Sequence, residues 1–167
     1  MTYYVLVVIE LSTRRVEIAV ITPHPTAAFM QRCARQLTDP FDEFLLGKRY
    51  LLHDRDTKFT AAFDALLKAS GREPLLLPPR SPNLNAYCER FMRSITEKAL
   101  GHMVMLSEPA LFYVIHEYLA HYHTERNPQG LTNRLITPEP DLGSQTGQVR
   151  RCERLDGLLR YYYRDAA

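Results

Sequence analysis

Hydrophobic positions along the chain follow two kinds of pattern. Continuous or alternating apolar runs, rich in β-branched residues, indicate strands, and they cover residues 3–9, 16–21, 49–53 and 74–77. Apolar residues repeated at helical spacing indicate helices, and they cover residues 26–37, 59–70, 84–100 and 107–122. Strands and helices that follow one another in this way predict an α/β fold.

The connections between these segments predict how the strands pair. The link over residues 10–15 is short and polar, which favours an antiparallel hairpin between the first two strands. The strands at 49–53 and 74–77 are joined through a helix that Gly71 ends. We therefore expect these two strands to be parallel, with a right-handed crossover.

Composition divides the chain into three regions. Residues 124–149 are polar and rich in proline and glycine, as is typical of a connecting segment. The tail that follows carries β-rich residues around an Asp156-Gly157 turn signal, which predicts a small hairpin. We therefore expect a core domain over residues 1–131, a linker over 132–149 and a basic, aromatic hairpin over 150–167.

Charge, hydropathy and cysteine spacing argue against a membrane-spanning protein, a secreted protein and a cysteine zinc protein. The 21 Lys and Arg residues and 19 Asp and Glu residues leave a net charge of +2, so any basic surface is local. No apolar run approaches the roughly 20 residues of a membrane helix, and the first residues lack the basic start of a signal peptide. We expect a cytoplasmic protein with no membrane partner. The three cysteines form no CxxC pair, so we expect reduced thiols and no cysteine zinc site.

Two carboxylates stand where a chemical site can form. Asp54 directly follows a buried strand, and ligand-binding groups of α/β sheets gather at the carboxyl ends of strands. The alternative is an Asp that caps the turn into the next helix. Glu89 lies on the polar side of the helix at 84–100, and the alternative there is a surface ion pair with Arg93.

The segments His53–Phe59 and Ser81–Phe91, each carrying one of these carboxylates, resemble a known family. In order, spacing and element type they are similar to the integrase core of DDE transposases and retroviral integrases, especially that of bacterial insertion-sequence transposases. Asp54 matches the second catalytic Asp, Glu89 matches the final Glu, and the 34 residues between them fit the family. The likeness covers roughly residues 3–131.

The resemblance implies a ribonuclease H-like mixed sheet flanked by helices, and metal-dependent phosphoryl transfer on DNA. Two Mg²⁺ or Mn²⁺ ions clamp a phosphodiester in such sites, and hard cations prefer carboxylate oxygens. Asp54 and Glu89 are therefore the expected metal ligands and catalytic residues. Because a nuclease of another ribonuclease H-like lineage would not share the Arg126 segment, we favour transposition and DNA integration.

The sequence departs from the family at its beginning. The central strand that carries the first catalytic Asp would precede Met1, so we expect a truncated core with one weakly held ion or none and little activity alone. Glu10 could replace the missing carboxylate, but a turn carboxylate near Arg14 or Arg15 is the favoured interpretation. The alternative function is a non-catalytic DNA-binding or oligomerising remnant of a transposase.

DNA and a second copy of the chain are the expected partners. Strand donation by a neighbour would compensate for the missing strand and make the protein a homo-oligomer. Contacts with DNA phosphates are expected from basic residues in the loop before the long helix, on that helix and after the last helix. These residues are Arg80, Arg90, Arg93, Lys98 and Arg126.

Overall fold

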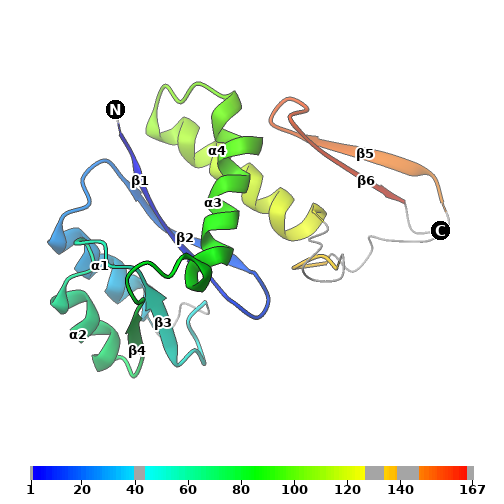
Figure 1. The fold of residues 1–167 in the computed structure, drawn as a ribbon. Coiled ribbons are helices and arrows are strands. Elements are labelled where there is room, and N and C mark those ends of the chain that lie inside the picture. The colour runs from blue at the N-terminus through cyan, green and yellow to red at the C-terminus, as the bar shows by residue number, and fades with distance from the viewer. Residues whose placement is uncertain (1, 40–43, 127–133, 139–146, 165–167) are drawn as a thin grey trace. The chain divides into compact units, whose positions relative to one another are not determined.

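The structure is a computed structural model that describes residues 2–39, 44–126, 134–138 and 147–164, with the side chain of Pro82 excepted. Every strand and helix that the hydrophobic pattern predicts is present (Figure 1). In chain order they are β1 (Tyr4–Ile9), β2 (Val16–Thr22), α1 (Ala27–Leu37), β3 (Tyr50–His53), α2 (Ala61–Ala69), β4 (Glu73–Leu76), η1 (Pro82–Asn85), α3 (Ala86–Lys98), η2 (Leu100–His102), α4 (Glu108–Ala120), η3 (His121–Glu125), β5 (Val149–Arg154) and β6 (Leu159–Arg164). Within the described residues, no helix has the length and apolar character needed to cross a membrane.

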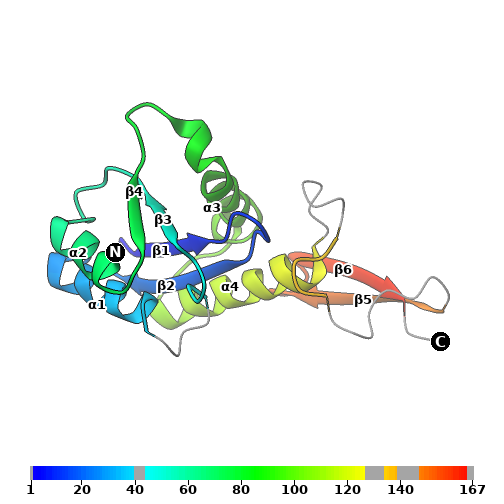
Figure 2. The same ribbon diagram turned by 90° about the horizontal axis from the view of Figure 1, so that it is seen from below.

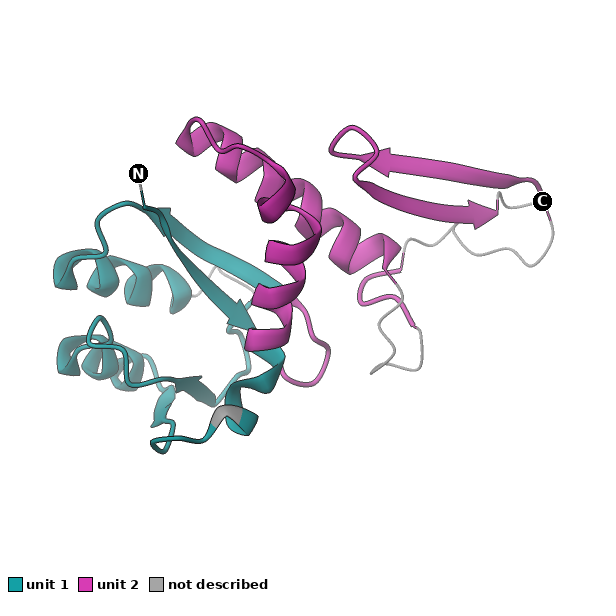
Figure 3. Ribbon diagram, turned by 45° about the horizontal axis from the view of Figure 1, so that its top comes forward, with its two compact units in different colours: residues 1–9, 16–88 teal, residues 10–15, 89–167 magenta. Residues whose placement is uncertain are grey.

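The chain divides into two compact units (Figure 3). Unit 1 comprises residues 1–9 and 16–88, and unit 2 comprises residues 10–15 and 89–167. The division therefore passes through the first turn of α3. The expected linker over 132–149 falls largely outside the described residues, so the expected domain boundaries stay predictions.

The first two strands of unit 1 form the expected antiparallel hairpin. Tyr4 pairs with Thr22 and Ile9 pairs with Val16, and the register shifts between Leu6 and Val7. A register shift of this kind adds a residue to one strand and increases its twist. The prediction of an antiparallel hairpin is confirmed.

The strands β3 and β4 are parallel, as the connection through a helix predicted. Tyr50 pairs with Glu73 and His53 pairs with Leu76. Helix α2 joins the two strands and ends in a Schellman motif, in which the Gly71 amide donates to Lys68 and the Arg72 amide donates to Leu67. Gly71 has a φ of 79°, a conformation that favours glycine.

The four strands of unit 1 do not join into the single mixed sheet that the resemblance implied. Hydrogen-bonded ladders among the described strands link β1 only to β2 and β3 only to β4. Figure 2 shows α1 and α2 side by side next to both strand pairs. Unit 1 is therefore a mixed α/β structure that contains two small sheets.

Apolar side chains connect the two strand pairs of unit 1 through its helices. One cluster contains Val8, Ala19, Leu37, Phe44 and Leu45, and the other contains Met30, Ala34, Phe63 and Leu67. Leu6 of β1 and Leu51 of β3 pack against both clusters. The two helices and this pair of leucines therefore hold unit 1 together where no ladder joins its sheets.

Unit 2 is built around the crossing of α3 and α4 (Figure 3). The ring of Phe91 lies 5.9 Å from that of Tyr118 and 5.1 Å from that of Tyr122. The Tyr118 hydroxyl donates to the Ser94 hydroxyl at 2.7 Å, so its polar end is satisfied inside the core. The predicted terminal hairpin is confirmed: β5 and β6 pair antiparallel, from Val149 opposite Arg164 to Arg154 opposite Leu159.

The long helix is shorter than the sequence predicted. Residues 82–85 form a 3₁₀ turn, the α-helix spans Ala86–Lys98, and residues 100–102 form a second 3₁₀ turn. Leu84, the first apolar residue of the helix predicted over 84–100, is 52% exposed. The asparagines on either side of Leu84 compete for backbone hydrogen bonds and favour turns over helix, which accounts for the shift.

Truncation of Phe63 tests the core of unit 1. Phe63 is 1% exposed, so we expect Phe63→Ala to lower the free energy of unfolding by about 3–5 kcal/mol through lost burial and a cavity. Phe112→Ala is the control, because Phe112 is half exposed. Urea unfolding followed by circular dichroism measures both variants, and equal losses would contradict this packing.

Candidate active site and nucleic-acid interface

Asp54 lies at the carboxyl end of β3 with its side chain exposed. One carboxylate oxygen accepts the Asp56 amide hydrogen at 3.0 Å, which closes a small turn after the strand. Asp54 does not cap α2, because the cap is Thr60, whose hydroxyl accepts from the Phe63 amide at 3.4 Å. The structure thus shows the turn contact of the alternative interpretation, although Asp54 does not cap α2 itself, and the carboxylate is exposed to solvent.

The loop that carries Asp54 is tied to β4. The Arg55 Nε donates to the Leu77 carbonyl at 3.0 Å, and the Leu77 amide donates to the His53 carbonyl at 3.0 Å. These contacts extend the pairing of β3 and β4 by one step beyond the strand ends. They fix the backbone on both sides of the Asp54 carboxylate.

His53 supports the same loop from inside unit 1. Its Nδ1 lies 2.9 Å from the Asp54 carbonyl oxygen, and its Nε2 lies 3.0 Å from an oxygen of Asp64. The ring is buried against Phe59, with centroids 4.8 Å apart. Sequence reasoning missed this positioning residue; the available signal was a histidine directly before Asp54. The expectation of a buried strand before Asp54 is wrong, because Tyr50 and Leu52 of β3 are exposed and His53 is its buried residue.

Asp56 is engaged by a neighbouring cation. Its carboxylate accepts from the Lys58 amide at 2.9 Å and from the Lys58 ammonium at 2.8 Å. These hydrogen bonds lower the pKa of Asp56, and the Asp56 hydrogen bond raises the pKa of Lys58. Asp56 therefore stabilises the loop as an ion pair beside Asp54.

Glu89 lies in the first turn of α3 and is exposed. Of the residues that the structure describes, none forms an ion pair with Glu89, and the alternative of a Glu89–Arg93 pair is not observed. Asp54 belongs to unit 1 and Glu89 to unit 2, so their meeting in one metal site stays a prediction. Over the described ranges, no three His, Cys, Asp or Glu side chains are grouped so as to hold a metal ion.

Glu10 serves the turn of the β1–β2 hairpin. Its two carboxylate oxygens accept from the Ser12 hydroxyl at 2.8 Å and from the Thr13 hydroxyl at 2.9 Å. Its backbone pairs with Arg14 and Arg15 across the turn. The turn role favoured from the sequence is thus observed, with hydroxyl groups as hydrogen-bond donors to the carboxylate.

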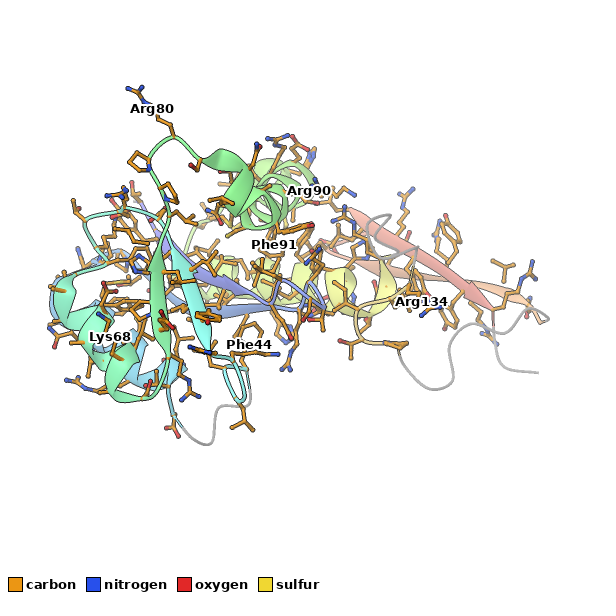
Figure 4. All side chains as sticks on the ribbon, turned by 60° about the horizontal axis from the view of Figure 1, so that its bottom comes forward. Phe44, Lys68, Arg80, Arg90, Phe91 and Arg134 are labelled. Carbon is orange, nitrogen blue, oxygen red and sulfur yellow. The ribbon has the colours of Figure 1, made fainter. Side chains whose placement is uncertain are left out.

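The basic residues predicted to contact DNA fall into two groups. Arg80, Arg90, Arg93 and Lys98 are exposed, and Figure 4 shows Arg80 extending outward from the loop after β4. Arg80 has a φ of 57°, an uncommon conformation for a residue other than glycine. Lys98 ends α3, and burial together with the charge of Arg126 lowers its pKa.

Arg126 forms the second group by itself, because it is half-buried. It donates to the Ser94 hydroxyl at 2.9 Å and lies 5.5 Å above the ring of Tyr122. Burial raises the pKa of Tyr122, while the charges of Arg126, Arg14 and Arg90 act to lower it. The three arginines therefore share the surroundings of one tyrosine, and Arg14 was not predicted to belong with them.

A buried ionic network holds the C-terminal hairpin to η3. The Arg154 Nε donates to Glu125 at 2.7 Å and its Nη1 donates to Glu117 at 3.1 Å. The His121 Nδ1 donates to the other oxygen of Glu125 at 2.9 Å. Burial acts to raise the pKa of Glu125, but the hydrogen bonds from Arg154 and His121 outweigh it and lower that pKa. Burial lowers the pKa of His121 despite the neighbouring carboxylate.

Comparison with known proteins establishes the fold. No protein-family model and no curated protein matches the chain. Among solved structures, it is similar to the crystal structure of the catalytic core domain of BIV integrase, with a TM-score of 0.54 and 23% sequence identity. The match covers 75% of this chain and 78% of that chain. The integrase-like core expected from the sequence is therefore confirmed at the level of fold.

Acid should weaken unit 2 through this network. The pKa values of His121 and Glu125 are lower in the folded protein than the values of about 6.5 and 4.3 in the unfolded chain. Each group therefore stabilises the folded state fully at pH values above its unfolded pKa. This stabilisation is lost as the pH falls through the folded-state pKa. Glu125→Gln should lower the free energy of unfolding at pH about 7 by about 1–3 kcal/mol and flatten its decline toward pH about 4.

Urea unfolding at several pH values measures this effect. Glu153→Gln on the same hairpin is the control, because that carboxylate is exposed and its surface pairs contribute little. An unchanged pH dependence in Glu125→Gln would show that the network does not control stability.

Proposed function

We propose that this chain acts in DNA integration or transposition, through metal-dependent phosphoryl transfer on DNA. The observation that carries the proposal is an exposed carboxylate, Asp54, at the carboxyl end of β3 in a chain with the fold of an integrase core. Ligand-binding groups in open α/β sheets gather at this end of the strands. The resemblance to bacterial insertion-sequence transposases is the finer part of the proposal.

Asp54 and Glu89 would hold the metal ion. Both side chains are exposed and offer oxygen donors, the ligand type that Mg²⁺ and Mn²⁺ prefer. A bound ion would activate the attacking hydroxyl or stabilise the leaving oxygen of a phosphodiester. His53 and Arg55 act as positioning residues, because their hydrogen bonds fix the loop that presents Asp54.

The donor set is one carboxylate short of the three that the resemblance implies. Asp56 is a poor replacement because Lys58 already neutralises it. Glu10 is occupied by hydroxyl donors in its own turn. We therefore expect one weakly held ion and little catalysis unless a further carboxylate is supplied.

The same proposal accounts for the break between the two strand pairs. The family's strand with the first catalytic Asp would lie between the strands that correspond to β1 and β3. Two observations support this placement. Both β1 and β3 pack against side chains of α1 and α2, and no hydrogen-bonded ladder joins β1 to β3 in the described structure. Strand donation by a second copy of the chain would supply the missing backbone pairing.

DNA phosphates are the proposed partners of the exposed arginines Arg80, Arg90 and Arg93. Guanidinium groups bind phosphate oxygens by paired hydrogen bonds. Lys98 and Arg126 remain proposed DNA contacts, and we expect their substitution to weaken DNA binding less. Arg126 also contacts Ser94 and Tyr122 within unit 2.

Metal titration tests the catalytic proposal. We expect isothermal titration of Mn²⁺ into the full chain to give a weak site that Asp54→Asn abolishes, because the variant loses a charged ligand. Asp156→Asn is the matched control, since Asp156 lies in the β5–β6 turn and asparagine tolerates its φ of 53°. Binding that survives Asp54→Asn would contradict the assigned ligand.

DNA nicking separates the enzyme from the alternative of a non-catalytic remnant. An enzyme should nick DNA in the presence of Mn²⁺ and lose this activity in Asp54→Asn. A remnant should bind DNA equally well with and without that substitution and should nick with neither form.

Duplex DNA binding tests the basic face of α3. Removing both Arg90 and Arg93 by substitution with alanine should reduce the slope of log K against log salt concentration by about 2, because each phosphate contact contributes about 0.9. Lys68→Ala combined with Arg35→Ala removes the same charge from helices of unit 1 and should leave the slope nearly unchanged. Fluorescence anisotropy at several salt concentrations gives both slopes, and equal slopes would refute a contact at α3.

A further inference from the structure

The two faces of the β5–β6 hairpin differ in character. Cross-strand partners in an antiparallel pair share a face, and successive residues alternate between faces. Arg150, Cys152, Arg154, Leu159, Tyr161 and Tyr163 lie on the inner face, and all of them except the exposed Arg150 are buried or half-buried. The outer face is formed by Val149, Arg151, Glu153, Arg160, Tyr162 and Arg164, and all six are exposed.

The outer face is predominantly cationic. It carries three arginines and a single carboxylate, Glu153. Glu153 lies 3.1 Å from Arg151 and 3.4 Å from Arg160, so it partly neutralises both. Arg164 donates to the Gly147 carbonyl at 2.8 Å through Nη1, and the residue is exposed. The face therefore retains a net positive charge spread along the ribbon.

One aromatic ring stands among these charges. Tyr162 is 58% exposed, and in the described structure its ring is not stacked on any other. Its neighbours Tyr161 and Tyr163 project to the opposite face, where their rings stack with centroids 5.9 Å apart. Packing therefore accounts for Tyr161 and Tyr163 but leaves the ring of Tyr162 accessible.

We infer that this outer face of β5–β6 binds single-stranded DNA. Arginines along a strand can follow successive phosphates, while an exposed aromatic ring stacks on an unpaired base. A base within a duplex is already stacked on both sides, so Tyr162 favours the single-stranded form. None of the outer-face residues is a proposed catalytic residue. The inference rests on the proposed function only for the choice of DNA as the nucleic acid.

Charge removal tests the phosphate contacts. Fluorescence anisotropy would follow a labelled oligothymidylate of about 15 nucleotides binding to the full chain at several salt concentrations. Substituting alanine for Arg151, Arg160 and Arg164 together should reduce the slope of log K against log salt concentration by about 2, because each single-strand phosphate contributes about 0.7. The control removes Arg35, Arg49 and Lys68 from unit 1, and its slope should stay nearly unchanged.

Substitution of the aromatic residue tests base stacking. Tyr162→Ala should weaken binding about tenfold or more, whereas Tyr162→Phe should bind like the natural chain because the ring is kept. Tyr113→Ala is the control, since Tyr113 is similarly exposed on α4. Loss of binding in Tyr162→Phe as well would overturn the stacking contact.

Glu153→Gln tests the phosphate contacts through a gain of binding, which loss of the fold does not explain. The substitution frees Arg151 and Arg160 from their carboxylate, so affinity for the oligonucleotide should rise several-fold at low salt. Unchanged or weaker binding would overturn the assignment of these arginines to phosphate.

Further measurements distinguish single-stranded DNA from an acidic peptide or duplex DNA as the ligand of this face. Polyglutamate of equal charge should compete poorly, and competition equal to that of DNA would assign the face to an acidic peptide instead. Asp54→Asn should bind the oligonucleotide like the natural chain, because Asp54 is not part of the β5–β6 face. This expectation holds whether or not the chain nicks DNA, so the single-strand proposal is tested separately from the catalytic proposal. Tighter binding of a duplex, with no loss in Tyr162→Ala, would also overturn it.

Discussion

The architecture of unit 1 depends on two partly buried leucines that pack against two helices. Leu6 of β1 and Leu51 of β3 come from strand pairs that no ladder joins in the described structure, yet both pack against the apolar side chains of α1 and α2. In a continuous sheet, backbone hydrogen bonds would fix the strands relative to one another. Here burial of apolar surface does so. The end of β3, and with it Asp54, is positioned by this packing.

Polar contacts then set the finer geometry, and each unit uses them differently. In unit 1 the bonds from Arg55 and His53 hold the backbone around an exposed carboxylate, so the loop is fixed while Asp54 stays accessible. In unit 2 the Glu125–Arg154 pair is largely buried and ties a hairpin to the end of a helix. A buried pair of this kind stabilises only when its remaining hydrogen bonds are satisfied, and His121 supplies one of them.

Function, in this view, comes from local concentrations of charge on a nearly neutral chain. A net charge of +2 gives little long-range attraction for a polyanion. Exposed arginines on α3 and on the outer face of β5–β6 create positive surfaces at particular elements instead. The candidate chemistry at Asp54 and the proposed single-strand surface around Tyr162 are carried by separate parts of the chain. The proposed function would use both surfaces, because strand breakage and capture of an unpaired strand are different tasks.

The sequence by itself determined the elements and their order, because hydrophobic periodicity and turn residues act over a few positions. The likeness to an integrase core came from the resemblance of the two segments that carry Asp54 and Glu89. The sequence also identified Asp54 as a carboxylate at a strand end. Only the tertiary structure decided that the strands form separate pairs, that His53 and Asp64 support the Asp54 loop, and that Tyr162 faces away from Tyr161 and Tyr163. Pairing, register and burial depend on contacts between residues far apart in the sequence, and a local pattern cannot specify which distant group satisfies a given side chain.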